Sequence, residues 1–314
     1  MSAPLFDEQF LHRLERLALL TRKATAGQMQ GERRSPKRGQ SVEFADFRPY
    51  VAGDDFRRID WNAYARLERF FIKLFVEEED LTVHFLIDAT RSMAWGSPRK
   101  LDYAARAAGA LGYIALTGLD RVTVTALGGG HANGAPPGRT SLRYFPPARG
   151  KRQALALFTF LQALTADSNG NSESTWERGS IFDPAARLRS YAGAAGRPGP
   201  LLLFSDLMDD GWLEGLRLLA SHGFEVSVVH VLAPEEVQPE LDGDLKLLDS
   251  ESMAEVEITA DYALLSRYQQ GLKGWRQELG KFCAARGMHY VPLDTSLPLE
   301  ELLFAWMRRK GVLR

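Results

Sequence analysis

The hydrophobic pattern of the chain alternates between short apolar runs and longer stretches with helical spacing. The runs at 81–87 (LTVHFLI) and 201–204 (LLLF) are typical of strands buried on both faces of a sheet. Between and after such runs, apolar side chains recur every three or four residues, most clearly from Leu265 to Phe282. This alternation of strands and helices predicts a mostly parallel sheet with helices on both faces.

The connections between these elements refine the predicted topology. Only a loop joins the run at 121–127 to that at 142–145, so the second run is expected to be an antiparallel edge strand. Residues 234–260 predict a β-hairpin excursion. Because parallel crossovers are right-handed and here reverse once, we predict a doubly wound, Rossmann-type three-layer α/β fold, with 81–87 and 201–204 as central neighbours.

The first 80 residues have a different character. Residues 4–30 show helical spacing, and residues 40–66 mix charged with aromatic side chains. We therefore predict an N-terminal helical and β extension, residues 1–80, before a domain of residues 81–314 that contains the hairpin. The mixed segment holds no metal-ligand spacing and no nucleophile–base pair, which favours a structural network over a second interface. The residues of that alternative interface are Asp54, Asp55, Arg57, Arg58, Asp60 and Trp61.

Composition and charge narrow the classes of partner and location. The chain has 314 residues, of which 45% are hydrophobic and 25% charged, as in a soluble globular protein. Its 39 basic and 40 acidic residues give no reason to expect nucleic acid or anionic lipid as a partner. The single cysteine excludes a disulfide framework and a cysteine zinc site. With no apolar run long enough to cross a bilayer and no secretory signal, we expect no membrane span and a cytoplasmic location.

The candidate ligand side chains follow the ends of the two most hydrophobic runs. The first ends in Asp88-Ala89-Thr90-Arg91-Ser92, which puts one carboxylate and two hydroxyls at alternate positions, and the second ends in Ser205-Asp206. Ligands of doubly wound sheets bind at this carboxyl edge, where the winding reverses. Hard oxygen ligands suit Mg²⁺ better than zinc. Asp, Thr and Ser also cap helices, but capping alone would have to explain two strands that both end in an acid.

The pattern Asp88-x-Thr90-x-Ser92, followed far downstream by Asp206, resembles the metal-ion-dependent adhesion site of von Willebrand factor A domains. That family uses D-x-S-x-S, a Thr on a middle loop and a later Asp. Gly179-Ser180 matches the middle loop, so the resemblance implies Ser180 as a further ligand, although other hydroxyls of that loop compete with it. Thr90 and Ser180 depart from the family residues, but both keep a hydroxyl. The implied ion is Mg²⁺, with Mn²⁺ or Ca²⁺ as alternatives.

A closer resemblance covers nearly the whole chain. Four segments resemble the bacterial domain-of-unknown-function 58 family: SVEFADFRPYVAGDDFRRIDWNAYAR, FIKLFVEEEDLTVHFLIDATRSM, LLLFSDLMDD and RGMHYVPLDTSLPLEELL. The resemblance implies a von Willebrand A-like domain behind a charged aromatic segment. It also implies, as partners, a MoxR-type AAA ATPase and membrane-anchored von Willebrand A proteins. We therefore expect a non-enzymatic adaptor or accessory protein that works with that ATPase in protein assembly or maturation, and that uses the ion to bind a partner's carboxylate.

Two other functions stay open. The first is a structural interaction protein that holds no metal. The second is a Mg²⁺-dependent phosphoryl hydrolase similar to the haloacid dehalogenase phosphatases, which need a second Asp as general acid where this chain has Thr90. No G-x-S-x-G elbow is present, and His84 and His230 fall inside predicted strands. No catalytic constellation was found, so an enzyme is the least supported reading.

Overall fold

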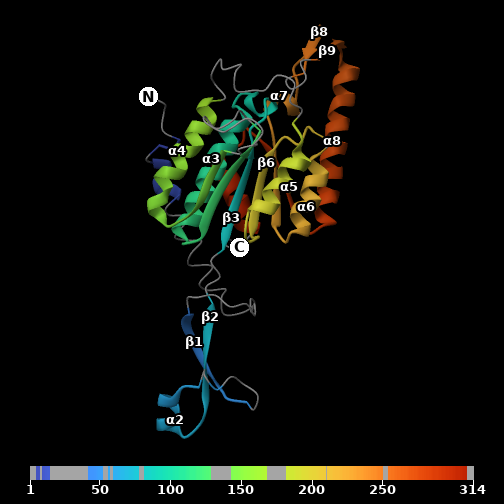
Figure 1. The fold of residues 1–314 in the computed structure, drawn as a ribbon. Helices are drawn as coiled ribbons and strands as arrows, with labels where there is room; N and C mark the ends of the chain where they lie inside the picture. Colours follow the sequence, from blue (N-terminus) through green and yellow to red (C-terminus); the bar gives the residue numbers. More distant parts are fainter. Residues whose placement is uncertain are drawn as a thin grey trace. The chain divides into compact units, whose positions relative to one another are not determined.

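A six-stranded sheet is the centre of the larger of two compact units (Figure 1). The structure is a computed structural model. It describes residues 5–7, 9–14, 42–51, 56, 59–77, 81–128, 143–167, 182–209, 211–249 and 254–309. The larger unit consists of Met1–Gln28 and Leu81–Arg314, and the smaller of Met29–Asp80. Phe6, Phe10 and Leu14, which the predicted division at residue 80 assigns to the extension, are buried in the core of the larger unit.

The strand order of the sheet is β10-β7-β6-β3-β4-β5. Its strands are β3 (Thr82–Asp88), β4 (Arg121–Leu127), β5 (Arg143–Arg149), β6 (Pro200–Ser205), β7 (Glu225–Leu232) and β10 (His289–Asp294). All neighbours are parallel except β4 and β5. The chain builds outward from β3 to β4 and β5, then returns to the other side of β3 for β6, β7 and β10. The predicted doubly wound α/β fold is therefore confirmed, with β3 and β6 as central neighbours and β5 as the antiparallel edge.

Helices cover both faces of this sheet (Figure 1). On one face, α3 (Lys100–Thr117), α4 (Ala154–Asp167) and α9 (Leu299–Arg309) share a core with Phe85 and Ile87 of β3. On the other, α5 (Pro184–Ala194), α6 (Trp212–Ser221) and α8 (Tyr262–Ala284) pack around Leu86. Successive side chains of a strand point to opposite faces, so a strand that feeds two cores must be apolar throughout. This is why β3 and β6 read as continuous apolar runs.

The predicted β-hairpin is present as β8 (Gly243–Leu248) and β9 (Glu255–Ala260). It follows a one-turn helix, α7 (Pro234–Val237), which begins directly after β7. Short 3₁₀ turns, η2 (Ser92–Ala94) and η3 (Lys151–Gln153), complete the unit. Because α7 and η2 follow the last residues of β7 and β3, both contribute to the carboxyl edge of the sheet.

The smaller unit consists of an antiparallel pair, β1 (Val42–Pro49) and β2 (Phe71–Glu77), and a helix between them, α2 (Trp61–Leu67). Neither β1 nor α2 was predicted from the sequence. In β1, the alternation of apolar and charged residues is broken by a register shift between Phe44 and Asp46, which hides the strand period. Helix α2 has only seven residues, none of them buried, so it is too short for a periodic pattern to predict it.

Candidate functional site

Asp88 is the last residue of β3, and its carboxylate organises the candidate site. The residue is only 1% exposed. Its Oδ1 accepts hydrogen bonds from the backbone N of Thr90 (3.0 Å) and from the Thr90 hydroxyl (2.7 Å). The Thr90 hydroxyl in turn lies 3.1 Å from the Ser92 hydroxyl. The alternate spacing of Asp88, Thr90 and Ser92 in the sequence therefore becomes a continuous row of oxygen atoms, which ends at the partly exposed Ser92.

The neighbouring strand closes the other side of this carboxylate. Ile87 lies opposite Phe204 in the parallel ladder of β3 and β6, so the next residues, Asp88 and Ser205, meet at the carboxyl edge. The Ser205 hydroxyl donates to Oδ2 of Asp88 at 2.6 Å and accepts the backbone N–H of Leu207 at 2.9 Å. Both oxygens of Asp88 are thus hydrogen-bonded within the protein.

Asp206 follows β6 and is paired with a buried lysine. Its Oδ2 accepts from Nζ of Lys100 at 2.8 Å, and its Oδ1 from the backbone N of Met208 at 3.3 Å. The same ammonium lies 2.5 Å from Oε1 of Glu236, whose second oxygen accepts the backbone N–H of Ala233 at 2.8 Å. The Lys100 side chain is 1% exposed and the Asp206 side chain 2%. A buried ion pair therefore joins α3, β6 and α7 at the carboxyl edge.

The electrostatics of this cluster are unbalanced. Asp88, Asp206 and Glu236 bring three carboxyl groups to one ammonium. Burial and, second, the nearby Asp206 raise the pKa of Asp88 to about 7, although hydrogen bonds from Ser205 and Thr90 oppose the shift. Burial lowers the pKa of Lys100, but Asp206 and Glu236 outweigh it and hold that pKa above its usual value. Within the described part of the chain, Asp88 is thus a buried carboxyl group without a cationic partner of its own, and it favours either a proton or an added cation.

The oxygen atoms present fit a hard divalent cation. The part of the chain that the structure describes contains no group of three His, Cys, Asp or Glu side chains that could hold a metal ion. An ion at this edge would therefore rely on two carboxylates, Asp88 and Asp206, together with the hydroxyls of Thr90 and Ser92. Mg²⁺ is bound in this way in many proteins, through one or two carboxylates with other oxygens and water. Ser180, the predicted middle ligand, lies outside the described residues.

Gly128 brings the loop after β4 close to the same row of oxygens. Its φ of +82° is a backbone conformation that residues other than glycine rarely adopt. A Cβ at this position would lie 3.0 Å from Cγ2 of Thr90. The backbone N–H of Ala89 also donates to the carbonyl of Leu127 at 2.7 Å. The turn after β3 is therefore held by β4 on one side and by β6 on the other.

The predicted second interface falls only partly within the described residues. Asp54, Asp55, Arg57 and Arg58 lie outside them. The Asp60 carboxylate caps α2, where it accepts the backbone N–H groups of Asn62 (2.8 Å) and Ala63 (3.2 Å). Trp61 is 60% exposed and lies edge-to-face with Tyr64 and Phe70, which are themselves exposed. The smaller unit thus carries an exposed aromatic cluster, which we define as Trp61, Tyr64 and Phe70.

Three residues of the cluster at the carboxyl edge were missing from the predicted site: Ser205, Lys100 and Glu236. Ser205 could have been found, since it directly precedes Asp206. Lys100 gives a weaker signal. A lysine at the first residue of a helix is opposed by the helix dipole, and α3 has no side-chain cap, so its place there calls for carboxylates nearby. Glu236 has no distinguishing sequence feature, because it reaches Lys100 only through the fold.

Comparison with known proteins identifies the family. The family model described as "Protein of unknown function DUF58" matches residues 46–278. The chain belongs to the DUF58 family. It is 26% identical over 312 residues to the uncharacterized protein Mb1516 of Mycobacterium bovis, covering 98% of this chain and 92% of the relative. The uncharacterized protein Rv1480 of Mycobacterium tuberculosis matches with the same identity and coverage.

Solved structures resemble this DUF58 chain weakly. The conserved hypothetical protein BatB from Bacteroides thetaiotaomicron is 14% identical, with a TM-score of 0.41 over 74% of this chain and 98% of that one. The pilus adhesin SpaC from Lactobacillus rhamnosus GG is 12% identical, with a TM-score of 0.41 over 74% of this chain and 31% of that one. We take no functional conclusion from similarity at this level. None of the helices in the described residues has the length and apolar character needed to cross a bilayer.

Proposed function

We propose that this DUF58 protein is a non-enzymatic accessory protein that binds a partner protein through a divalent cation at the carboxyl edge of β3 and β6. One observation carries the proposal: two buried carboxyl groups, Asp88 and Asp206, lie at the ends of neighbouring central strands, and among the described residues Asp88 has no cationic partner. A carboxylate in that position is costly unless a positive charge or a proton accompanies it. A bound cation would remove that cost.

Four residues would hold the ion: Asp88 and Asp206 through carboxylate oxygens, and Thr90 and Ser92 through hydroxyls. Ser205 and the backbone N–H of Thr90 orient Asp88, while Lys100 fixes one oxygen of Asp206. Mg²⁺ is the ion we favour, with Mn²⁺ or Ca²⁺ as alternatives, because the ligands are oxygens and only two are carboxylates. When bound, the ion supplies an open coordination position for a carboxylate of the partner.

The partner class rests on the family resemblance in the sequence. We propose a MoxR-type AAA ATPase, or membrane-anchored von Willebrand A proteins, as partners in the assembly or maturation of other proteins. The adhesion-site resemblance of Asp88-x-Thr90-x-Ser92 supports a von Willebrand A-like role for this edge of the sheet. We also propose a cytoplasmic location, which the single cysteine supports, since a reducing compartment makes no use of disulfides.

A second candidate is a metal-free interaction protein, and the Lys100–Asp206 ion pair favours it. The ammonium of Lys100 already neutralises Asp206 at 2.8 Å. In that case Asp88 would retain a proton near neutral pH in place of a metal ion, as its raised pKa allows. The same edge could then bind its partner without any ion.

Binding of the purified chain to the MoxR-type ATPase of the same genome, in Mg²⁺ and in EDTA, separates these candidates. We expect EDTA to weaken binding by at least tenfold, and Asp88→Asn to bind equally weakly in both buffers. Asp261→Asn is the matched control, since Asp261 only caps α8 through Leu264 N (2.7 Å) and asparagine caps equally well. Equal wild-type affinity in both buffers would contradict the metal-dependent proposal and support the metal-free one.

A further inference from the structure

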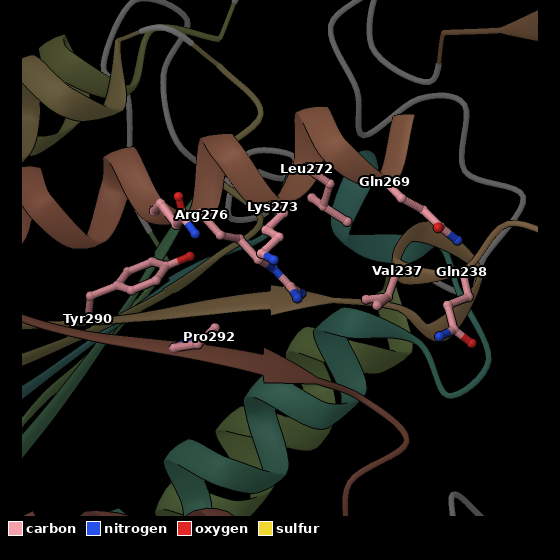
Figure 2. A pocket seen from close by; sticks show the side chains of 9 residues that line it. Val237, Gln238, Gln269, Leu272, Lys273, Arg276, Tyr290 and Pro292 are labelled. Atoms are coloured by element: carbon pink, nitrogen blue, oxygen red, sulfur yellow. The ribbon is translucent and has the colours of Figure 1, made fainter. Parts of the chain in front are cut away.

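A pocket of about 410 Å³ opens between α7, α8 and β10 (Figure 2). Its volume lies within the range of small-molecule sites. Side chains of α8 form one wall, Val237 and Gln238 the wall at α7, and Tyr290 and Pro292 the floor on β10. The pocket belongs to the larger unit and does not include any residue of the candidate metal site.

The charge of the pocket is one-sided. Two of its residues, Lys273 and Arg276, are cationic, three are glutamines, and none of the nine described lining residues is acidic. Figure 2 shows the Lys273 and Arg276 side chains extending from α8 across the pocket. Nε of Arg276 is buried and has no hydrogen-bond partner among the residues that the structure describes. Buried donors nearly always have a partner, so this Nε–H is available to the acceptor of a ligand.

The neighbouring acid does not serve as that acceptor. Glu236 lies directly before Val237 in α7, but its carboxylate accepts from Lys100 and from the backbone N of Ala233. Its carbonyl oxygen accepts the Tyr268 hydroxyl at 2.7 Å, which ties α7 to α8. The Glu236 carboxylate is therefore engaged in the ion-pair cluster, and no acidic side chain lies among the nine described residues that line the pocket beside Lys273 and Arg276.

The floor of the pocket is uncharged. The Tyr290 hydroxyl lies 2.6 Å from Nδ1 of His230, which is fully buried in β7. Burial and, second, Arg276 lower the pKa of His230 to about 4, so the imidazole is neutral at physiological pH. Tyr290 is thus held in place from behind, with its ring against the pocket. Three amides, Gln238, Gln269 and Gln277, add groups that can both donate and accept.

We propose that this pocket binds a small organic anion, whose phosphate or carboxylate group is held by Lys273 and Arg276. Arginine suits this role because its planar guanidinium pairs with oxyanions through two parallel hydrogen bonds. Leu272, Val237 and Pro292 provide apolar contact for the body of the ligand, and the glutamine amides provide hydrogen bonds for its polar groups. The juxtaposition that carries the proposal is a guanidinium whose buried Nε has no partner among the described residues, beside an ammonium in a cavity of this size.

Calorimetric titration of the full chain with inorganic phosphate and, separately, with glutarate tests the proposal. Both titrations are run at constant ionic strength, and the tighter ligand tells a phosphate site from a carboxylate site. We expect saturable binding of at least one anion, weakened at least tenfold in Lys273→Gln/Arg276→Gln. The matched control, Arg267→Gln/Lys281→Gln, removes two exposed cations of α8 outside the pocket and should bind as the wild type does.

The single variant Lys273→Gln keeps the test decisive if the double variant does not fold. Its side chain is exposed, so the fold should be retained while anion binding weakens several-fold. Two results would overturn the proposal. One is the absence of saturable binding of either anion by the wild type. The other is equal binding by the wild type, the pocket variants and the control, which would indicate non-specific binding of anions outside the pocket.

Discussion

Lys100 is the residue that makes the buried carboxylates at the carboxyl edge tolerable. Replacing it with methionine keeps the size of the side chain but leaves Asp206 and Glu236 buried without their ammonium. Removing one partner of a buried ion pair costs about 3–5 kcal/mol. We therefore expect Lys100→Met to lower the free energy of unfolding by this amount, as measured by urea denaturation in EDTA.

Lys246→Met is the control for this prediction. Lys246 pairs with Glu255, but both side chains are more than half exposed. Exposed ion pairs contribute roughly 0–1 kcal/mol, so this variant should unfold almost as the wild type does. Similar losses for the two lysine variants would mean that the Lys100 pair is not the buried, structurally required pair described above.

His84 should make the folded protein less stable as the pH falls. Burial lowers the pKa of His84 to about 4, whereas in the unfolded chain it is about 6.5. Between these values the unfolded chain binds more protons, so stability is fully present above pH 6.5 and is lost as the pH falls toward 4. By linkage, acidification from pH 7 to pH 5 should cost about 2 kcal/mol through His84 alone.

The variant His84→Gln isolates this effect from other titrating groups, such as Asp88, whose raised pKa acts in the opposite direction. Glutamine can still hydrogen-bond the Tyr191 hydroxyl, which lies 2.7 Å from Nδ1 of His84. We expect the difference in unfolding free energy between pH 7 and pH 5 to be smaller for this variant. If the unfolding free energies of variant and wild type changed with pH in parallel, His84 would have the same pKa in the folded and the unfolded chain, which would contradict this prediction.

At the scale of elements, Gly215 allows α6 to approach α5 closely. A Cβ at Gly215 would lie 2.5 Å from Cδ1 and 3.1 Å from Cβ of Leu188, so Gly215→Ala should destabilise the protein by about 1–3 kcal/mol. Gly271, within α8, has nothing within 4 Å of such a Cβ. Gly271→Ala should stabilise by up to about 1 kcal/mol through helix propensity. Thermal unfolding of the two variants should therefore shift in opposite directions, and shifts of the same sign would contradict this packing.

Elements with a clear apolar period were predictable from the sequence, and elements without one were not. The runs that became β3 and β6 feed two cores, and the stripe from Leu265 to Phe282 predicted α8. In contrast, α2 has only seven residues and buries none of them, which is too little for a helical period to be recognised. Strand β5 extends through Pro146 and Pro147, which would break a central strand but are tolerated at an edge, where one side needs no ladder partner.

The residues of the site also fall into those that the sequence could predict and those that it could not. Asp88, Thr90 and Ser92 are close in sequence, so their spacing alone suggested that their oxygens meet. Asp206 could be added because both acids end strands that were expected to be neighbours. Lys100 and Glu236 are 136 positions apart, and they meet only because β7 returns α7 to the start of α3. No local pattern encodes such a contact, so the ion pair became visible only in the fold.

At the scale of the whole molecule, the exposed aromatic cluster of the smaller unit is a second candidate surface for a partner, beside the proposed metal site of the larger unit. We expect Trp61→Ala, in the aromatic cluster of the smaller unit, to weaken partner binding by about 2 kcal/mol, as central aromatic residues of interfaces do. It should leave metal binding unchanged. Tyr262→Ala, which removes an aromatic side chain that is 89% exposed on the larger unit, is the control and should have no effect. Equal partner affinities for wild type and Trp61→Ala would remove the smaller unit from the interface.

The central claim is that the carboxyl edge of β3 and β6 holds a divalent cation, and titration with Mn²⁺ followed by electron paramagnetic resonance tests it most directly. The wild type and the Asp261→Asn control should each bind one Mn²⁺, which Mg²⁺ displaces. In Asp88→Asn and Asp206→Asn, the affinity for Mn²⁺ should be at least tenfold lower. Since a cation competes with the proton for Asp88, its binding should also strengthen above pH 7. Identical Mn²⁺ binding by all four proteins, or none by the wild type, would contradict the account.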